Sequence, residues 1–143
     1  MVQGGGKTGM AAALAMAIFI TFSVLAVNCA AAECSRTCVT QNCDSIRLRY
    51  GKYCGVGHTG CRGEPPCDDV DACCRVHDEC TGIKGVTSIK CHQQLIRCVK
   101  RARKSRKPGF SRVCPVSTIV PAIIRGMNMA ILGSSFGSGA GIV

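Results

Sequence analysis

The chain lacks most of the side chains that give a small protein a large aromatic core. It contains no tryptophan, and aromatic residues account for only 4% of its 143 positions. A chain of this length has room for one domain rather than two, and it buries only a modest core. It has 13 cysteines instead, so we expect covalent cross-links to limit the unfolded state and supply the missing stability.

Charged residues are absent from Ala11–Val27, which is apolar. The single basic residue Lys7 precedes this run, and alanines at positions 30 and 32 follow it. This order is typical of a secretory signal peptide that is cleaved after Ala32. A transmembrane anchor is the alternative, but the run is at the short limit for a membrane span and no basic cluster follows it. We therefore predict a signal peptide over residues 1–32 and one secreted, extracellular domain over residues 33–143.

Cleavage after Ala32 removes one of the 13 cysteines, Cys29, and leaves 12. An even number of cysteines in a small secreted chain indicates six disulfides. The same spacing in a cytosolic protein would suggest zinc, but the secretory route oxidises thiolates before they can hold a metal. The sequence contains no N-x-S/T motif, so we expect no N-linked glycan.

Acidic residues are also missing from the second half of the chain. None of the eight Asp and Glu residues lies beyond Glu79, whereas eight of the 18 basic residues fall within Arg97–Arg112. Such an excess of positive charge is typical of a protein that contacts an anionic surface, for example a membrane. A solvated helix face that keeps the protein soluble is the alternative. A secreted chain rarely meets nucleic acid, and we expect no such partner.

The segment that precedes the first long helix is predicted to be irregular. Residues 33–52 form a short arm, with one helical turn expected across Cys34 and Cys38. The glycines and prolines of residues 53–66 exclude regular structure there. We therefore expect a loop rather than a helix or a strand over residues 53–66.

Two helices are expected in the middle of the chain. The first runs from about Cys67 to about Thr81, with acidic residues in its first turn that favour the helix dipole, and Gly82 ends it. The second begins after a Ser88 cap and stops before Pro108.

An apolar segment over residues 116–133 predicts a third helix. Pro121 is placed to start it, because proline is favoured in the first turn of a helix. The segment could contact a membrane, but packing in the core is the preferred interpretation. Residues 133–143 are predicted to be a flexible tail.

The spacing of four cysteines sets a register for the two middle helices. Cys73 and Cys80 are seven residues apart, as are Cys91 and Cys98, so each pair lies on one face of its helix. If the helices are antiparallel, Cys73 meets Cys98 and Cys80 meets Cys91. Twelve cysteines allow on the order of ten thousand pairings, so the spacing favours these two disulfides without proving them.

A histidine and an aspartate stand together on the first of these helices. His77 lies between the two cysteines and faces the partner helix or the cleft beside it, and Asp78 follows it. A His-Asp pair alone indicates little, but the upstream loop contains Gly55, Gly57 and Gly60, which tolerate unusual dihedral angles. Backbone carbonyls from such a loop and one carboxylate are ligands that Ca²⁺ prefers.

A calcium site beside a histidine indicates hydrolysis. The histidine can take a proton from water, while the metal polarises a carbonyl and stabilises the oxyanion. This chemistry needs no serine nucleophile. An EF-hand counted from Asp68 fails, because Val70 and Ala72 would stand at ligand positions.

Two longer motifs resemble a known family. The stretch Y-G-K-Y-C-G-V-G-H-T-G-C, Tyr50–Cys61, is similar to the calcium loop of the secretory phospholipase A2 family. The stretch D-A-C-C-R-V-H-D-E-C, Asp71–Cys80, is similar to its active-site helix, and C-R-G-E-P-P-C resembles the plant-type branch. The resemblance is firm over residues 50–99.

The resemblance assigns a role to individual residues. His77 matches the general base, and Asp78 matches the carboxylate that binds Ca²⁺. Tyr53, Gly55 and Gly57 match the positions whose backbone carbonyls complete the calcium site. The implied disulfides are Cys54–Cys74, Cys73–Cys98 and Cys80–Cys91, of which the last two agree with the register above.

The resemblance also implies a fold and a reaction. The fold is small, mainly α and disulfide-rich, with two antiparallel cross-linked helices, a glycine-rich calcium loop and a C-terminal helix. The reaction is calcium-dependent hydrolysis of the sn-2 ester of glycerophospholipids at a membrane surface, which can be anionic, by a monomer. The alternatives are a catalytically silent binding module of the same fold and a cysteine-rich lipid-binding or defence protein.

One position departs from the animal members of the family. They place an aspartate just after the equivalent of Cys91 to hold the catalytic histidine, whereas this chain has His92. No acidic residue beyond Glu79 can replace it. We therefore expect His92 to be a secondary, orienting element.

Overall fold

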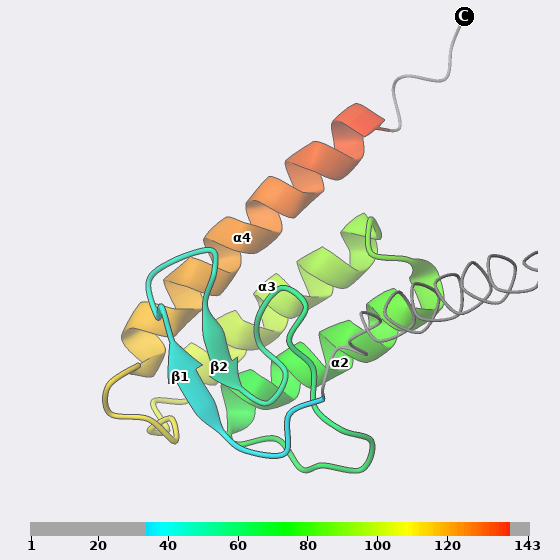
Figure 1. Ribbon diagram of the computed structural model, residues 1–143. Helices are drawn as coiled ribbons and strands as arrows, with labels where there is room; N and C mark the ends of the chain where they lie inside the picture. Colours follow the sequence, from blue (N-terminus) through cyan, green and yellow to red (C-terminus); the bar gives the residue numbers. More distant parts are fainter. Residues whose placement is uncertain (1–33, 138–143) are drawn as a thin grey trace, which may run out of the picture. The chain divides into compact units, whose positions relative to one another are not determined.

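The computed structural model describes residues 34–137, which fold as one unit of short strands and long helices (Figure 1). The predicted signal peptide and cleavage site lie outside the described residues. Strands β1 (Val39–Gln41) and β2 (Arg49–Gly51) form an antiparallel two-stranded sheet. Helices α2 (Asp69–Lys84), α3 (Ile89–Lys104) and α4 (Val116–Gly137) follow. The mainly helical, disulfide-rich architecture expected from the sequence is confirmed.

The helical turn predicted across Cys34 and Cys38 is not found, so that prediction was wrong: these residues are irregular apart from a bridge at Ser35, and strand β1 follows them. Val39 pairs with Gly51 and Gln41 with Arg49, and Ser35 forms a parallel bridge with Gly60. The disulfides Cys34–Cys61 and Cys38–Cys67 tie the arm to the following loop. These long-range links, together with the β-branched pair Val39 and Thr40, favour an extended chain over an isolated turn of helix.

Helix α2 begins where its acidic residues allow it to be capped. The Oδ1 atom of Asp68 accepts hydrogen bonds of 2.9 Å from the N–H groups of Val70 and Asp71, which satisfies two otherwise unpaired donors. The helix passes through Gly82, contrary to prediction, and ends at Gly85. Gly85 has φ +86°, a conformation in which a residue without Cβ pays no steric cost, and its N–H donates to Thr81.

Helix α3 starts after Ser88, as expected, but the Ser88 side chain makes no cap hydrogen bond. The Ser88 carbonyl instead accepts hydrogen bonds from the N–H groups of Cys91 and His92, at 3.0 and 3.2 Å. The helix ends at Lys104, before the predicted stop at Pro108. These boundaries leave all four ladder cysteines inside the two helices.

Two disulfides join α2 to α3 as the rungs of an antiparallel ladder. Cys73–Cys98 and Cys80–Cys91 have Cα–Cα distances of 5.7 and 5.8 Å. Cys54–Cys74 fastens the glycine-rich loop to the same turn of α2. The described chain holds six disulfides, and the pairs that the sequence left unassigned are Cys34–Cys61, Cys38–Cys67 and Cys43–Cys114.

Helix α4 begins five residues before Pro121, so proline does not start it as predicted. The carbonyl of Pro115 accepts the N–H groups of Thr118 and Ile119 and opens the helix there instead. The helix also continues to Gly137, past the expected start of the tail at residue 133. Residues 138–143 of that predicted tail lie outside the described residues.

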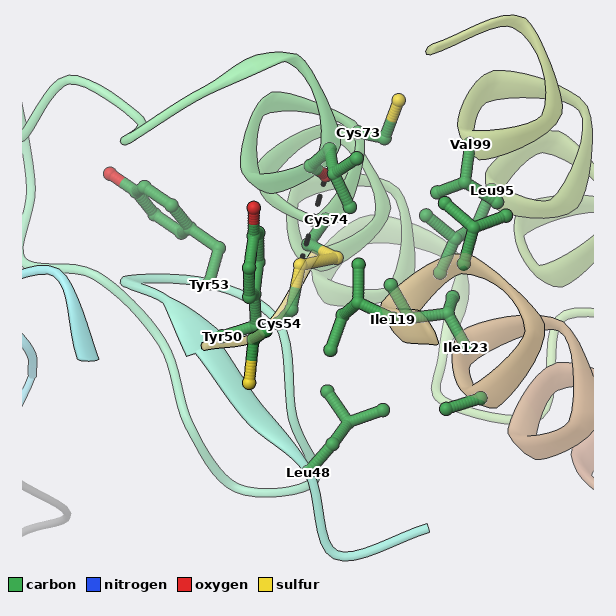
Figure 2. Close-up of a cluster of buried hydrophobic side chains, with 14 residues drawn as sticks. Leu48, Tyr50, Tyr53, Cys54, Cys73, Cys74, Leu95, Val99, Ile119 and Ile123 are labelled. Carbon is green, nitrogen blue, oxygen red and sulfur yellow. Dashed lines mark hydrogen bonds between the residues drawn. A yellow bond between two sulfur atoms is a disulfide. The ribbon is translucent and has the colours of Figure 1, made fainter. Parts of the chain in front are cut away.

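The first half of α4 completes the core. Figure 2 shows Ile119 and Ile123 facing the Cys54–Cys74 disulfide and the α3 side chains Leu95 and Val99. Among the described side chains of the second half none is buried, and Phe136 retains 80% of its accessible surface. The 21 residues Val116–Phe136 are apolar and long enough to cross a membrane by length and composition alone, with 22% of the tested stretch buried. Core packing therefore describes the first half of this helix only.

Candidate active site and calcium site

His77 and His92 face each other across the α2–α3 ladder. His77 lies between the two α2 cysteines, and His92 follows the cysteine of one rung, so the disulfides set their approach. His77 Nε2 and His92 Nδ1 are 3.0 Å apart, within hydrogen-bond distance. The His92 side chain is buried, with 3% of its surface exposed. The position that departs from the animal pattern thus contacts the candidate base.

The protonation of this pair can be reasoned from its surroundings. Burial, and to a smaller extent the neighbouring His92, lowers the pKa of His77 to about 4. His77 is therefore neutral near pH 7 and can accept a proton. In the tautomer that leaves Nδ1 of His77 free, its Nε2–H donates to Nδ1 of His92. That arrangement puts the His92 proton on Nε2, a buried atom that has no partner among the described residues.

Asp78 lies on the other side of the His77 ring. Its Oδ1 atom is 4.0 Å from Nδ1 of His77, and its Oδ2 atom accepts a 3.0 Å hydrogen bond from the Thr59 hydroxyl. Burial is the main cause that raises the pKa of Asp78 to about 6. Within residues 34–137, no Lys or Arg side chain pairs with this carboxylate. A half-buried carboxylate without a cationic partner suits a bound cation.

The glycine-rich loop brings backbone groups to this side of α2. Gly57 has φ +66°, a conformation that favours glycine, and a side chain at Gly55 would place its Cβ 2.5 Å from the Leu48 carbonyl oxygen. The Thr59 hydrogen bond to Asp78 ties the end of this loop to the carboxylate. The described residues contain no group of three or more His, Cys, Asp and Glu that could hold a metal. A metal at Asp78 would therefore need backbone carbonyl ligands.

The residues predicted to bind the metal differ in what surrounds them. Tyr53 is nearly buried and is held at both ends, by its N–H on Asp71 and by its hydroxyl on the carbonyl of Glu64. The Gly55 carbonyl accepts a 3.2 Å hydrogen bond from the His58 N–H, which fixes the turn of the loop. The Asp78 carboxylate together with backbone carbonyl oxygens would make an all-oxygen donor set. This chemistry fits Ca²⁺.

No protein-family model matches the chain. Among curated proteins it is 49% identical to phospholipase A2-beta of Arabidopsis thaliana, over 83% of this chain and 85% of that protein. It is 52% identical to probable phospholipase A2 homolog 1 of rice, Oryza sativa subsp. japonica, over 73% of this chain and 76% of that protein.

The chain belongs to the phospholipase A2 family.

Solved structures agree with this assignment. The structure of rice phospholipase A2 superposes with a TM-score of 0.66 at 36% identity, covering 73% of this chain and 88% of that one. A second structure of the rice protein, a complex with octanoic acid, gives the same TM-score and identity. As a phospholipase A2, this protein is an ester hydrolase that acts on phospholipids.

Asp71 is the residue of this phospholipase A2 site that sequence reasoning missed. Its fully buried carboxylate accepts hydrogen bonds of 2.9 to 3.1 Å from the N–H groups of Lys52, Tyr53 and Cys67. It therefore fastens both ends of the glycine-rich loop to α2. The sequence presented Asp71 only as a first-turn acid, because its partners Lys52 and Tyr53 lie 18 to 19 residues away. Thr59 was missed for the same reason.

Proposed function

We propose that this phospholipase A2 hydrolyses the sn-2 ester of glycerophospholipids in a calcium-dependent reaction, releasing a fatty acid and a lysophospholipid. The observation that carries the proposal is the position of Nδ1 of His77, 4.0 Å from Asp78 Oδ1, with the other ring nitrogen on His92. One nitrogen thus faces the candidate metal site, and the other is held by protein.

His77 acts as the general base. Its Nδ1 atom takes a proton from a water molecule as that water attacks the ester carbonyl, and the imidazolium later returns the proton to the leaving alcohol. The lowered pKa keeps the ring neutral and ready to accept that proton. Because water is the nucleophile, the reaction forms no covalent enzyme intermediate.

Asp78 and the carbonyl oxygens of Tyr53, Gly55 and Gly57 would hold Ca²⁺. When bound, Ca²⁺ would supply positive charge to the ester carbonyl oxygen and to the oxyanion. The Gly55 N–H is an additional donor for the oxyanion. Asp71 supports this function indirectly, because its buried carboxylate accepts a hydrogen bond from the N–H of Tyr53 and so holds the backbone of the loop in place.

His92 orients the base. Its Nδ1 atom accepts the hydrogen bond from Nε2–H of His77 and so favours the tautomer with a free Nδ1. An aspartate would also stabilise the imidazolium with negative charge, which an imidazole side chain cannot supply. His92 therefore fixes geometry and contributes less to charge stabilisation than a carboxylate would.

The setting of the reaction is part of the proposal. Six disulfides fit an oxidising compartment, and the proposed enzyme is secreted, with Glu33 as its first residue after cleavage. We propose that it acts as a monomer on a phospholipid surface. A row of basic residues on and after α3 favours anionic lipid; it comprises Lys100, Arg101, Arg103, Lys104, Arg106 and Lys107.

The decisive experiment measures fatty-acid release from phospholipid vesicles with Ca²⁺ and with a chelator, for the wild-type chain and for His77→Ala. We expect release only by the wild-type chain with Ca²⁺. Calcium binding without hydrolysis would favour the silent binding module. Lipid binding without either calcium binding or hydrolysis would favour the cysteine-rich lipid-binding or defence protein.

A further inference from the structure

A pocket of about 530 Å³ opens between the end of α3 and the start of α4. It is formed by the last turn of α3, the connecting segment and the first turn of α4. Its lining residues are Arg103, Arg106, Lys107, Pro108, Gly109, Ser111, Arg112, Pro115, Val116 and Ser117. Four of these ten residues are cationic and none is acidic. Positive charge is therefore concentrated in this pocket and is not merely spread along the exposed face of α3.

The charges in the pocket are mostly uncompensated. Lys107 forms an ion pair with Asp69, at 3.2 Å, where α2 begins. Within the described chain, the side chains of Arg103, Arg106 and Arg112 make no ion pair or hydrogen bond with protein. Like charges that line one pocket repel each other, and an anion between them would relieve that repulsion. The three arginines supply planar donor groups suited to a tetrahedral oxyanion.

The backbone adds donors in the same place. The N–H groups of Val116 and Ser117, at the start of the 22-residue helix α4, have no acceptor within the described chain. The preceding residue is Pro115, whose side chain cannot cap them. In α2, by contrast, the Asp68 carboxylate accepts hydrogen bonds from two N–H groups of the first turn. The positive end of the α4 dipole therefore adds to the arginine charges.

We propose that this pocket binds a phosphate group, either inorganic phosphate or the terminal phosphate of a lipid headgroup. Three free guanidinium groups and two free backbone N–H groups match a dianion with several acceptor oxygens better than a carboxylate. The site is separate from the hydrolytic one. Asp69, which pairs with Lys107 of the pocket, marks the end of α2 nearest to it. His77 lies eight residues after Asp69, roughly 12 Å further along α2. The proposal therefore does not depend on the proposed catalytic mechanism.

Two triple variants with equal loss of charge test the site. The first, Arg103→Gln/Arg106→Gln/Arg112→Gln, removes the pocket cations that have no protein partner. The matched control, Lys100→Gln/Arg101→Gln/Lys104→Gln, removes three cations of α3 that do not line the pocket. Circular dichroism and denaturant unfolding should show that both variants fold as the wild-type protein does.

The readout is binding of inorganic phosphate, followed by NMR chemical shifts of the backbone N–H groups. We expect shifts at Val116 and Ser117 in the wild-type protein. The pocket variant should bind phosphate about tenfold more weakly or worse, because charge-assisted hydrogen bonds are lost, and the control variant should stay within about twofold. Equal weakening in both variants, or no localised shift in the wild-type protein, would overturn the proposal.

A second measurement assigns the source of the phosphate. The pocket variant and its charge-matched control are compared on vesicles with phosphatidic acid, a phosphomonoester, and on vesicles of equal charge with phosphatidylglycerol, a phosphodiester. A loss of binding by the pocket variant that is confined to phosphatidic acid supports a lipid headgroup as ligand. Phosphate binding in solution with equal vesicle binding by both proteins supports a free phosphate ion.

Discussion

Aspartates in the first turn and in the middle of α2 differ in how many hydrogen bonds their carboxylates accept from the protein. Asp71 in the first turn accepts hydrogen bonds from three backbone N–H groups. Asp68, the cap, accepts from Val70 and Asp71, and it also bonds the Tyr50 hydroxyl and the Phe110 N–H. Asp78, two turns later, has one hydroxyl partner and a pKa raised by burial. Asp68 and Asp71 organise the fold, whereas protein donors leave most of the acceptor capacity of Asp78 unused.

This contrast shows how one helix can hold both a structural and a reactive region. Carboxylates that are filled by protein donors stabilise the folded state, because each satisfied buried group avoids a desolvation cost. A carboxylate left with few donors costs stability in the free protein, and such a cost is typical of functional sites. The two regions should therefore respond in opposite ways to the same substitution.

The largest effect is expected in the reactive half of α2. His77→Ala should lower turnover by about 10²-fold or more, the usual scale for a lost general base, and should leave calcium affinity nearly unchanged. Steady-state hydrolysis and calorimetric calcium titration measure the two quantities. Near-normal hydrolysis by this variant would exclude His77 as the base.

The comparison of the two aspartates is tested by identical changes. Asp71→Asn should lower the free energy of unfolding by about 2 kcal/mol, since an amide cannot accept all of these backbone N–H groups. Asp78→Asn should leave the calcium-free protein as stable as before, or stabilise it, and should abolish calcium binding. Denaturant unfolding with the disulfides intact measures the first quantity. Equal destabilisation by both substitutions would contradict the distinction drawn between the two regions.

His92 should have a smaller effect than His77. His92→Asn should lower turnover by at most about tenfold, because the main electrostatic contribution does not come from this residue. The variant should also change the acid limb of the pH–rate profile, which a purely structural substitution would leave in place. Loss of activity equal to that of His77→Ala, with calcium binding preserved in both, would assign the base to His92 instead.

The smallest expected effect is a pH dependence of stability. Burial raises the pKa of Asp78 in the folded protein to about 6, above the ordinary value of 3.8 for the unfolded chain. Between those values the folded state holds the extra proton, so this group makes the calcium-free protein less stable as pH rises. Calcium binding needs the ionised form. The rise in melting temperature caused by Ca²⁺ should therefore be greater at pH 7.5 than at pH 5, and an equal rise would place the metal elsewhere.

Local signals in the sequence predicted the parts of this fold that depend on neighbours in the chain. The seven-residue spacing of the cysteines predicted the α2–α3 register, and with it the approach of His92 to His77. The helix boundaries were less accurate. Gly82 fits inside α2 because the capping conformation is available three residues later, at Gly85. Pro121 suggested the start of a helix that in fact begins five residues earlier, where the Pro115 carbonyl accepts the first backbone hydrogen bonds.

Contacts between distant segments were not predictable from the same signals. The arm became a strand because two disulfides and β2 hold it extended. Asp71 and Thr59 each act on a partner 18 or 19 residues away, and no local pattern marks such a pair. The phosphate pocket likewise needs the end of α3 and the start of α4 side by side. The candidate catalytic residues could be named from the sequence because both family motifs are continuous.

The unequal spans of the disulfides have a consequence for how the chain oxidises. Cys80–Cys91 closes a segment of only 11 residues, whereas Cys43–Cys114 closes one of 71. Loop-closure entropy alone favours the shorter closure by about 1.7 kcal/mol, more than tenfold in effective concentration. The hairpin of α2 and α3, which carries His77 and His92, is thus favoured to be crosslinked before α4 is tied to the arm. The active-site geometry would then be assembled early, and the link from Cys43 to Cys114 would be among the last to form.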